Sequence, residues 1–439
     1  MEVYCTKGQQ SFSGRMGTLG LFLFAFFSFL GTAGAHLGLG LILVAFIINI
    51  DDVWSEIKYD RVFWLSVASL FYLIVHTSWA MVSLPDLFDE HIKEASDWGK
   101  LILFICVAWQ LKQDRNMIGV LLFVIAAGFI LGLILSIDWG NIETLFSGER
   151  QRFHMMSNRI GIYSSVGIVG LVVLVNKFIG TSGQYHIALL RKALWLVVLV
   201  ILVQANIASQ SRGAWLSLII VLPIVFVLRV REHFLNKKSS ITSNTHMLVI
   251  SLVCVIGLIF LNIDSFRKRL GSEQAAVNAI ISQKYDKLPP VSTTWRFNVY
   301  RYGIEKWLER PLFGWGAGST EYLIKVSGNE GLKLPGSSGG LEWMDHFHST
   351  YLEILIRFGI VGLLFIFCVI WYVILELWKT YKANRADPDY VLFIMSGLGV
   401  IAIWSLFDFR ITHYDGRFLW YIVGGLAFSY GLKSEMKTE

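Results

Sequence analysis

The stretch Asp345-His346-Phe347-His348-Ser349-Thr350-Tyr351-Leu352-Glu353-Ile354-Leu355 marks the point where a polar loop gives way to a long apolar run, residues 360–377. From His348, the side chains at i+3, i+4 and i+7 are aromatic or apolar and lie on one face of a helix. We therefore expect His348 to start a helix near a membrane surface. Imidazole can take or give a proton near neutral pH, so His348 is a candidate general base. A capping or interfacial role is the alternative.

The composition indicates a membrane protein. The chain has 439 residues, of which 55% are hydrophobic and 16% are charged, and its mean hydropathy is +0.57. A hydrocarbon layer about 30 Å thick needs about 20 apolar residues per helix, and such runs recur along the chain. Unbroken apolar runs satisfy their backbone hydrogen bonds in lipid only as helices. The sequence therefore predicts an all-α integral membrane protein.

Sliding hydropathy predicts about twelve transmembrane helices. They are 16–34, 36–50, 62–84, 98–111, 117–137, 160–178, 189–208, 213–230, 246–263, 358–378, 391–409 and 416–432. The first of them is followed almost at once by another span, so we interpret it as a retained helix and not as a cleaved signal.

The charges of the loops predict the orientation. Loops counted alternately from the N-terminus hold most of the lysines, so the positive-inside rule places them, and both termini, in the cytoplasm. The opposite loops include the mainly acidic segment 85–97 and one large insertion. We expect nine spans in 1–263, an insertion with amphipathic helices in 264–347, and three spans in 348–439. Within the insertion, residues 294–309 keep a 3.6-residue period that predicts an amphipathic helix.

The loops on the outer face should be poor in basic residues, yet three of them carry cations that are all arginine. These are Arg150, Arg152 and Arg159 in the first, Arg212 in the second, and Arg410 and Arg417 in the third. Guanidinium is permanently charged and binds phosphate oxygens bidentately, so the set indicates a phosphate-bearing ligand at headgroup depth. Anchoring to lipid headgroups by snorkelling side chains is the alternative, and both interpretations stay open here.

Four other features have structural explanations. Asp387-Pro388-Asp389 fits a helix cap with Pro at the first helical position better than a metal-binding D-x-D. His76 lies alone within a span and is expected to be hydrogen-bonded between helices. Glu353 and Arg357 are spaced i, i+4 and should pair on the wet side of their helix. Gly314-Trp315-Gly316 follows a helix and not a strand, which favours a turn over a dinucleotide site.

Three motifs taken together resemble the O-antigen ligase and polymerase superfamily. They are Arg212 in Ser209-Gln210-Ser211-Arg212-Gly213-Ala214-Trp215, Arg296 ahead of Pro311-Leu312-Phe313-Gly314-Trp315-Gly316, and His348 in His-x2-Tyr-Leu-x2-Leu-x3-Gly-x2-Gly-Leu. Asn158 also resembles a family feature. Family ligases often carry Asn directly after the His, where this chain has Ser349.

The resemblance implies an inverting, metal-independent glycosyl transfer at the periplasmic face of the bacterial inner membrane, with no cofactor. The donor would be O-antigen polysaccharide on undecaprenyl pyrophosphate and the acceptor a lipid A-core oligosaccharide. His348 would be the base, Arg212 and Arg296 would bind the pyrophosphate, and Arg150, Arg152 and Arg159 are further candidate pyrophosphate ligands. Membrane lipids are the other expected partners, and no nucleic acid is expected.

Other functions stay open. Within the superfamily, the chain could be an O-antigen polymerase or a protein O-oligosaccharyltransferase. A secondary transporter or lipid flippase is the alternative from another class. Transporters usually bury ionisable groups at mid-membrane, whereas the spans predicted here are almost free of charge.

Overall fold

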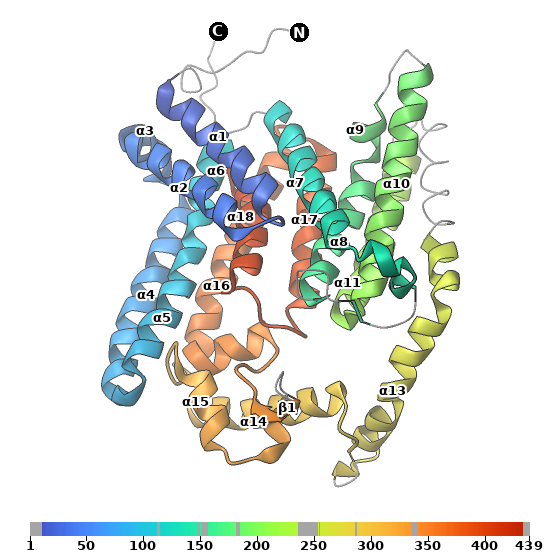
Figure 1. Cartoon of the computed structure of the whole chain (residues 1–439). Helices are drawn as coiled ribbons and strands as arrows, with labels where there is room; N and C mark the ends of the chain where they lie inside the picture. The colour runs from blue at the N-terminus through green and yellow to red at the C-terminus, as the bar shows by residue number, and fades with distance from the viewer. Residues whose placement is uncertain are drawn as a thin grey trace.

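The computed structural model describes residues 11–111, 115–146, 150–151, 157–180, 185–235, 253, 255–285, 288–335 and 340–432. The described part is almost entirely helical (Figure 1), which confirms the predicted all-α class. The α-helices are α1 Phe12–Phe27, α2 Thr32–Ile48, α3 Ile50–Ile57, α4 Arg61–Ser83, α5 Phe88–Gly99, α6 Phe104–Leu111, α7 Arg115–Ser136, α8 Ser157–Val173, α9 Val175–Ile179, α10 Tyr185–Ser209, α11 Arg212–Leu235, α13 Ile263–Ile281, α14 Ser292–Glu309, α15 Ser319–Val326, α16 Thr350–Lys382, α17 Pro388–Trp404 and α18 Tyr414–Ser429. Two short strands, β1 Lys333–Pro335 and β2 Leu341–Trp343, pair antiparallel.

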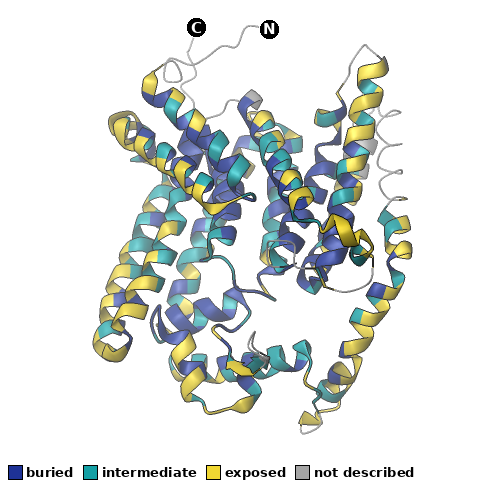
Figure 2. Cartoon of the chain, viewed as in Figure 1, coloured by how far each residue is buried: buried dark blue, intermediate teal, exposed yellow. Residues whose placement is uncertain are grey.

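Five helices of the described residues are long and apolar enough to cross a membrane. They lie in α4, α7, α10, α11 and α16. A sixth span is possible if α2 and α3 count together, although the two are bent by 81° relative to each other. The outer faces of these helices carry exposed apolar side chains such as Phe71, Ile219 and Phe367, as expected where lipid is the solvent. Figure 2 shows these exposed faces around a buried interior.

The count of twelve spans is not confirmed. The predicted span 98–111 is divided, because a 3-10 turn over Lys100–Leu103 separates α5 from α6. Helices α1, α8 and α17 are apolar but shorter than a full span. Most of the predicted span 246–263 lies outside the described residues. Hydropathy averages over a window, so it does not detect a break between two short helices of similar composition.

The core is formed by helices that are short but deeply buried. In α18, nearly every side chain from Phe418 onward is buried. Phe418 packs edge-on against Phe24 of α1 with ring centroids 5.3 Å apart, and Phe29 packs against Tyr163 of α8 at 4.5 Å. The N-terminal and C-terminal thirds of the chain therefore share one hydrophobic core.

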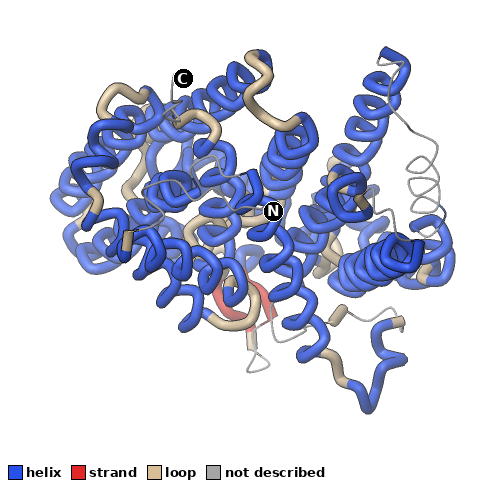
Figure 3. Tube along the Cα trace, turned by 90° about the horizontal axis from the view of Figure 1, so that it is seen from above, coloured by secondary structure: helices blue, strands red, loops and turns tan. Residues whose placement is uncertain are grey.

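The predicted insertion gathers at one end of the bundle. Helices α13, α14 and α15 and the β-hairpin lie there (Figure 1), and the view from above shows the strands beneath the upright helices (Figure 3). Helix α14, Ser292–Glu309, confirms a helix over the predicted residues 294–309, although Ile304 and Leu308 of the predicted apolar face are exposed. The acidic segment 85–97 reaches the same end, because the Gly318 N–H donates to His91 Nδ1 at 2.9 Å.

The turn at Gly314–Gly316 and a break in α16 fit into each other. Gly359 lies inside α16 with a φ of 64°, so the helical hydrogen bonds around it are interrupted. The backbone of residues 311–316 supplies the missing partners. The four bonds are Ile360 N to Pro311 O, Val361 N to Leu312 O, Trp315 N to Ile356 O and Gly316 N to Arg357 O, at 2.8–3.1 Å. A Cβ at position 359 would lie 2.2 Å from the Leu312 carbonyl, so only glycine fits there.

Two structural explanations from the sequence are confirmed. Asp387 caps α17 by accepting from Asp389 N, and both carboxylates are paired with cations, Lys177 and Arg229, each at 2.5 Å. His76 is hydrogen-bonded as expected, but the partner of its Nε2, at 2.6 Å, is the Phe313 carbonyl in the turn and not a residue of another helix. These residues are therefore accounted for by the fold.

Candidate active site

A polar cavity of about 210 Å³ lies where the insertion meets the helical bundle. Its lining comes from segments that are far apart in the sequence. The charged and titratable residues around it are Arg150, Arg212, Arg269, Arg296, His348, Asp408 and Arg410, and we call this site the arginine cavity.

The structure brings together most of the residues that the sequence singled out. Arg212, Arg296, His348 and Arg150 line the arginine cavity, as does Asn158. Arg152 lies outside the described residues.

Arg159 is not in the arginine cavity. Its Nε lies 2.9 Å from Asp415 Oδ2, and its guanidinium stacks on the ring of Tyr414 at 4.6 Å from the centroid. Arg417 is likewise paired, with Asp97 at 2.5 Å. The partners of both arginines lie more than 200 residues away along the chain, so sequence alone could not separate them from the cavity arginines.

Three helices begin at the arginine cavity. Helix α11 starts at Arg212, α14 starts at Ser292, and α16 starts at Thr350 directly after His348. The N-terminus of a helix carries a partial positive charge and unpaired N–H groups, which favour a bound anion. The backbone therefore adds to the positive potential that the arginines create.

Arg212 is held in place by the insertion. Its guanidinium donates to Thr293 Oγ1 at 3.0 Å and to Ser292 Oγ at 2.5 Å, both at the start of α14. Glu273 of α13 lies 3.3 Å from Arg212 and 3.7 Å from Arg269, so one carboxylate serves two guanidinium groups. Burial alone would raise the pKa of Glu273, but hydrogen bonds from Thr293 and the two arginines hold it below its usual value.

Arg296 has no such partner. It is half-buried, lines the arginine cavity, and makes no hydrogen bond or ion pair with any residue of the described part of the chain. Among the described residues, two carboxylates pair with the arginines around the cavity: Glu273 with Arg212 and Arg269, and Asp408 with Arg410. A site with this excess of positive charge attracts an anion.

His348 has a left-handed backbone conformation, with φ at 52°. Three contacts impose it: Phe347 N donates to Glu353 Oε1 at 2.6 Å, Tyr300 Oη donates to the His348 carbonyl at 2.9 Å, and Ser349 Oγ caps α16. Gln210, another cavity residue, also has a positive φ, of 48°. Non-glycine residues held in this region cluster at functional sites.

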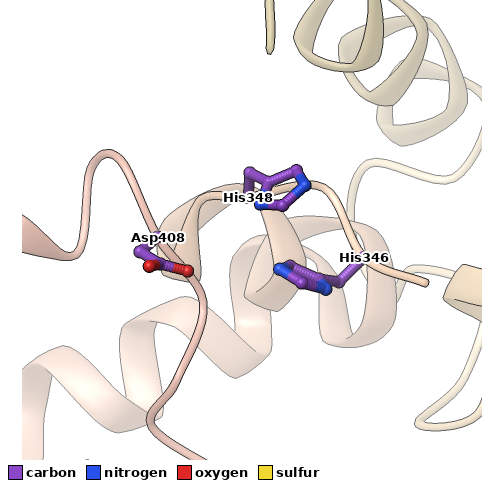
Figure 4. A group of neighbouring side chains, drawn as sticks. All are labelled: His346, His348 and Asp408. Carbon is purple, nitrogen blue, oxygen red and sulfur yellow. The ribbon is translucent and has the colours of Figure 1, made fainter. Parts of the chain in front are cut away.

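The surroundings of His348 keep its imidazole neutral. Burial and the neighbouring His346 lower the pKa of His348 to about 3, although Asp408 opposes this. A neutral imidazole has a free ring nitrogen that can accept a proton. Figure 4 shows the side chains of His346, His348 and Asp408 as neighbours.

Asp408 was not singled out by the sequence. It is 2% exposed, and its Oδ2 accepts a hydrogen bond from Asn158 Nδ2 at 2.5 Å; Asn158 Oδ1 in turn accepts from Arg150. Burial would raise the pKa of Asp408, but Arg410, the two histidines and Arg296 hold it low, so it stays ionised. Asp408 lies on the loop between α17 and α18, which nothing in the linear sequence connects to His348.

The predicted pair of Glu353 and Arg357 exists, but the prediction that it lies on the wet side of the helix is wrong. Glu353 is 0% and Arg357 4% exposed, and their side chains are 2.6 Å apart. Arg357 also pairs with Glu94 at 2.7 Å and donates to the Ala317 carbonyl, while Thr320 donates to Glu353. We call this set the Arg357 network. It connects α5, the turn and α15 to the loop that carries His348.

The fold and the cavity define a class: a helical membrane protein with an arginine-rich cavity beside a neutral histidine. Residues 195–367 match the family model described as O-antigen ligase, and this range holds Arg212, Arg296 and His348. This segment of the chain is therefore similar to the O-antigen ligase family. The chain is also 26% identical over 132 residues to a Rickettsia conorii protein described as a candidate polysaccharide ligase. That match covers 29% of this chain and 31% of the relative's length.

Proposed function

We propose that this protein is a membrane glycosyltransferase that ligates polysaccharide from undecaprenyl pyrophosphate onto a sugar of lipid A-core. The observation that carries the proposal is the convergence of Arg212, Arg296 and His348 on one cavity with excess positive charge. All three lie in the segment that matches the ligase family.

The arginines would bind the diphosphate of the donor. Arg296 has a guanidinium without a described partner, and Arg212 is held at the cavity by the hydroxyl groups of Ser292 and Thr293. Guanidinium groups bind phosphate oxygens well, because they can donate two parallel hydrogen bonds. Diphosphate is already a good leaving group, so its departure needs stabilisation of negative charge more than a general acid. Arg150, Arg410 and the unpredicted Arg269 would add to this field.

His348 would act as the base. The acceptor hydroxyl attacks the anomeric carbon, its proton passes to His348, and the bond from that carbon to the phosphate oxygen breaks in a single inverting displacement. A bound diphosphate would raise the pKa of His348 from its low value, because a nearby negative charge favours imidazolium. Asp408 would stabilise the same imidazolium.

The arginine cavity would face the periplasm of a bacterial inner membrane, with both termini in the cytoplasm. Support comes from the opposite end of the bundle, where Lys177, Arg229 and the basic end of α16 gather, in agreement with the positive-inside rule. The division into 1–263, 264–347 and 348–439 and the full set of twelve spans stay predictions within this proposal.

A polymerase or a protein O-oligosaccharyltransferase would use the same donor chemistry with another acceptor. Transport has weaker support. Two buried charged groups within α16, Glu353 and Arg357, are fixed by several hydrogen bonds and do not resemble mobile coupling groups.

The destination of a labelled sugar tests the proposal. Purified protein in liposomes would receive a labelled polysaccharide on undecaprenyl pyrophosphate together with lipid A-core. We expect label on lipopolysaccharide, and a loss of at least about 10²-fold for His348→Ala. Longer lipid-linked chains or labelled protein would indicate the two related activities. Wild-type transfer by a folded His348→Ala protein would exclude His348 as the base.

A further inference from the structure

We propose that His346, His348 and Asp408 form a binding site for a transition-metal dication such as Zn²⁺, and that a bound ion inhibits the protein by occupying His348. The inhibition rests on the proposed role of His348 as base, whereas the binding does not depend on it.

The three side chains already surround one point. One ligand atom from each lies within 4.8 Å of the other two, and the two imidazole rings are 4.1 Å apart. Figure 4 shows them converging from the loop before α16 and from the loop after α17. Zinc binds nitrogen at about 2.0–2.1 Å, so tetrahedral ligands stand about 3.3 Å apart. Side-chain rotations that close these gaps by about 1.5 Å would complete the site.

His346 is prepared as a metal ligand. Asp345 is hydrogen-bonded to its Nδ1, which leaves Nε2 as the free ring nitrogen. His346 is 6% exposed, and its Nε2 is buried without a hydrogen-bond partner in the structure. A buried polar atom without a partner is costly, and a metal ion would satisfy it. In zinc sites, a histidine ligand usually has its second ring nitrogen hydrogen-bonded to a carboxylate, as His346 is to Asp345 here.

The kind of ion follows from the donor set. Two imidazoles and one carboxylate favour Zn²⁺, Cu²⁺ or Ni²⁺ over Mg²⁺ and Ca²⁺, which prefer oxygen ligands. The carboxylates of Asp408 and Asp345 supply negative charge, while Arg296 and Arg410 oppose a cation. We therefore expect weaker binding than at a closed structural zinc site, and reversible inhibition.

A direct zinc measurement tests the site. Full-length protein, purified in detergent with a tag that lacks histidine, would be titrated with Zn²⁺ against a fluorescent chelator. We expect about one ion per chain, no competition from Mg²⁺, and at least a tenfold loss of affinity in His346→Gln. Asp345→Asn, which keeps all three ligands, should lose about tenfold or more. His413→Gln is the matched control, because His413 is a half-buried histidine on the same loop as Asp408 but outside the group.

Thermal unfolding in detergent would show whether each variant is folded. If His346→Gln does not fold, Asp345→Asn still tests the site. Equal zinc affinity in wild type and in both variants would overturn the site. Zinc that binds but leaves sugar transfer unchanged would overturn the inhibition. A wild-type protein that binds zinc and transfers no sugar would instead count against the proposed function, which keeps the two failures distinct.

Discussion

The arginine cavity and the Arg357 network are two clusters of buried charge about one loop, and they differ in how their charges are balanced. Arg357 pairs with two carboxylates and one carbonyl, and Glu353 is satisfied by three donors. Among the described residues of the arginine cavity there are five guanidinium groups and two carboxylates, and Arg296 contacts neither carboxylate. A balanced cluster holds the fold together, whereas an unbalanced one needs a ligand.

This contrast also separates the arginines that the sequence grouped together. Arg159 and Arg417 have carboxylate partners at 2.9 and 2.5 Å and belong with the balanced class. Arg212 shares its carboxylate, and Arg296 has none. The identity of the residue did not distinguish these cases, because the distinction lies in the partner.

The largest effect should follow from breaking the balanced cluster. Glu353→Ala would leave Arg357 with one carboxylate and the Phe347 N–H without its acceptor. We expect a loss of about 3–5 kcal/mol in the free energy of unfolding, since removal of one member of a buried pair leaves an uncompensated charge. Unfolding in detergent measures it, with Glu305→Ala as the exposed control. Equal stability of the two variants would refute the structural role of the network.

Arg296→Ala should have the opposite effect: sugar transfer should fall while the stability of the protein stays nearly unchanged. Because Arg296 has no described partner, the free energy of unfolding should change by no more than about 0.5 kcal/mol. Sugar transfer should fall by about 10²–10³-fold, as when one preorganised charge-stabilising donor is removed. Arg301→Ala, on the exposed face of the same helix, is the control. If Arg296→Ala lost stability as well as activity, Arg296 would have a structural role, like the arginines that are paired with carboxylates.

Removing a negative charge from the arginine cavity should strengthen its binding of anions. Glu273→Gln removes the negative charge shared by Arg212 and Arg269 but keeps an oxygen that can accept from Thr293 N. We expect inorganic pyrophosphate to bind several-fold more tightly, a gain of about 1 kcal/mol, seen as an increased thermal shift. Weaker binding would mean that Glu273 orients the arginines more than it competes with the ligand.

The smallest effect concerns pH. Burial lowers the pKa of His348 to about 3, so kcat/KM, which reports the free enzyme, should not fall as the pH drops from 7 through 6.5 to 5.5. The same shift acts on stability: the unfolded chain binds the proton below pH 6.5 while the folded chain does not, so stability is lost as the pH falls below 6.5. His348→Gln should reduce that loss. An acid limb at pH 6.5 in kcat/KM would show that the histidine is not desolvated.

The sequence predicted the class, the helix α14 and the three residues that meet in the cavity, because periodicity, hydropathy and motif order are local properties. It did not predict Asp408 or Arg269 as neighbours of His348, since these contacts join segments that are far apart in the chain. The sequence also led us to expect Glu353 and Arg357 on the solvent-exposed side of the helix. The i, i+4 spacing predicts that the two residues pair, but it does not show that Glu94 of α5 packs against them. The predicted turn at Gly314 and the glycine at 359 were seen separately, and only the structure shows that they fit together.

Binding of undecaprenyl pyrophosphate to the purified protein tests the central claim most directly. We predict that wild type and Arg301→Ala bind it equally, and that Arg296→Ala binds at least about tenfold more weakly, a difference of about 1.4 kcal/mol. Equal affinity in all three proteins would contradict the claim that the unbalanced arginines of the cavity hold a lipid diphosphate.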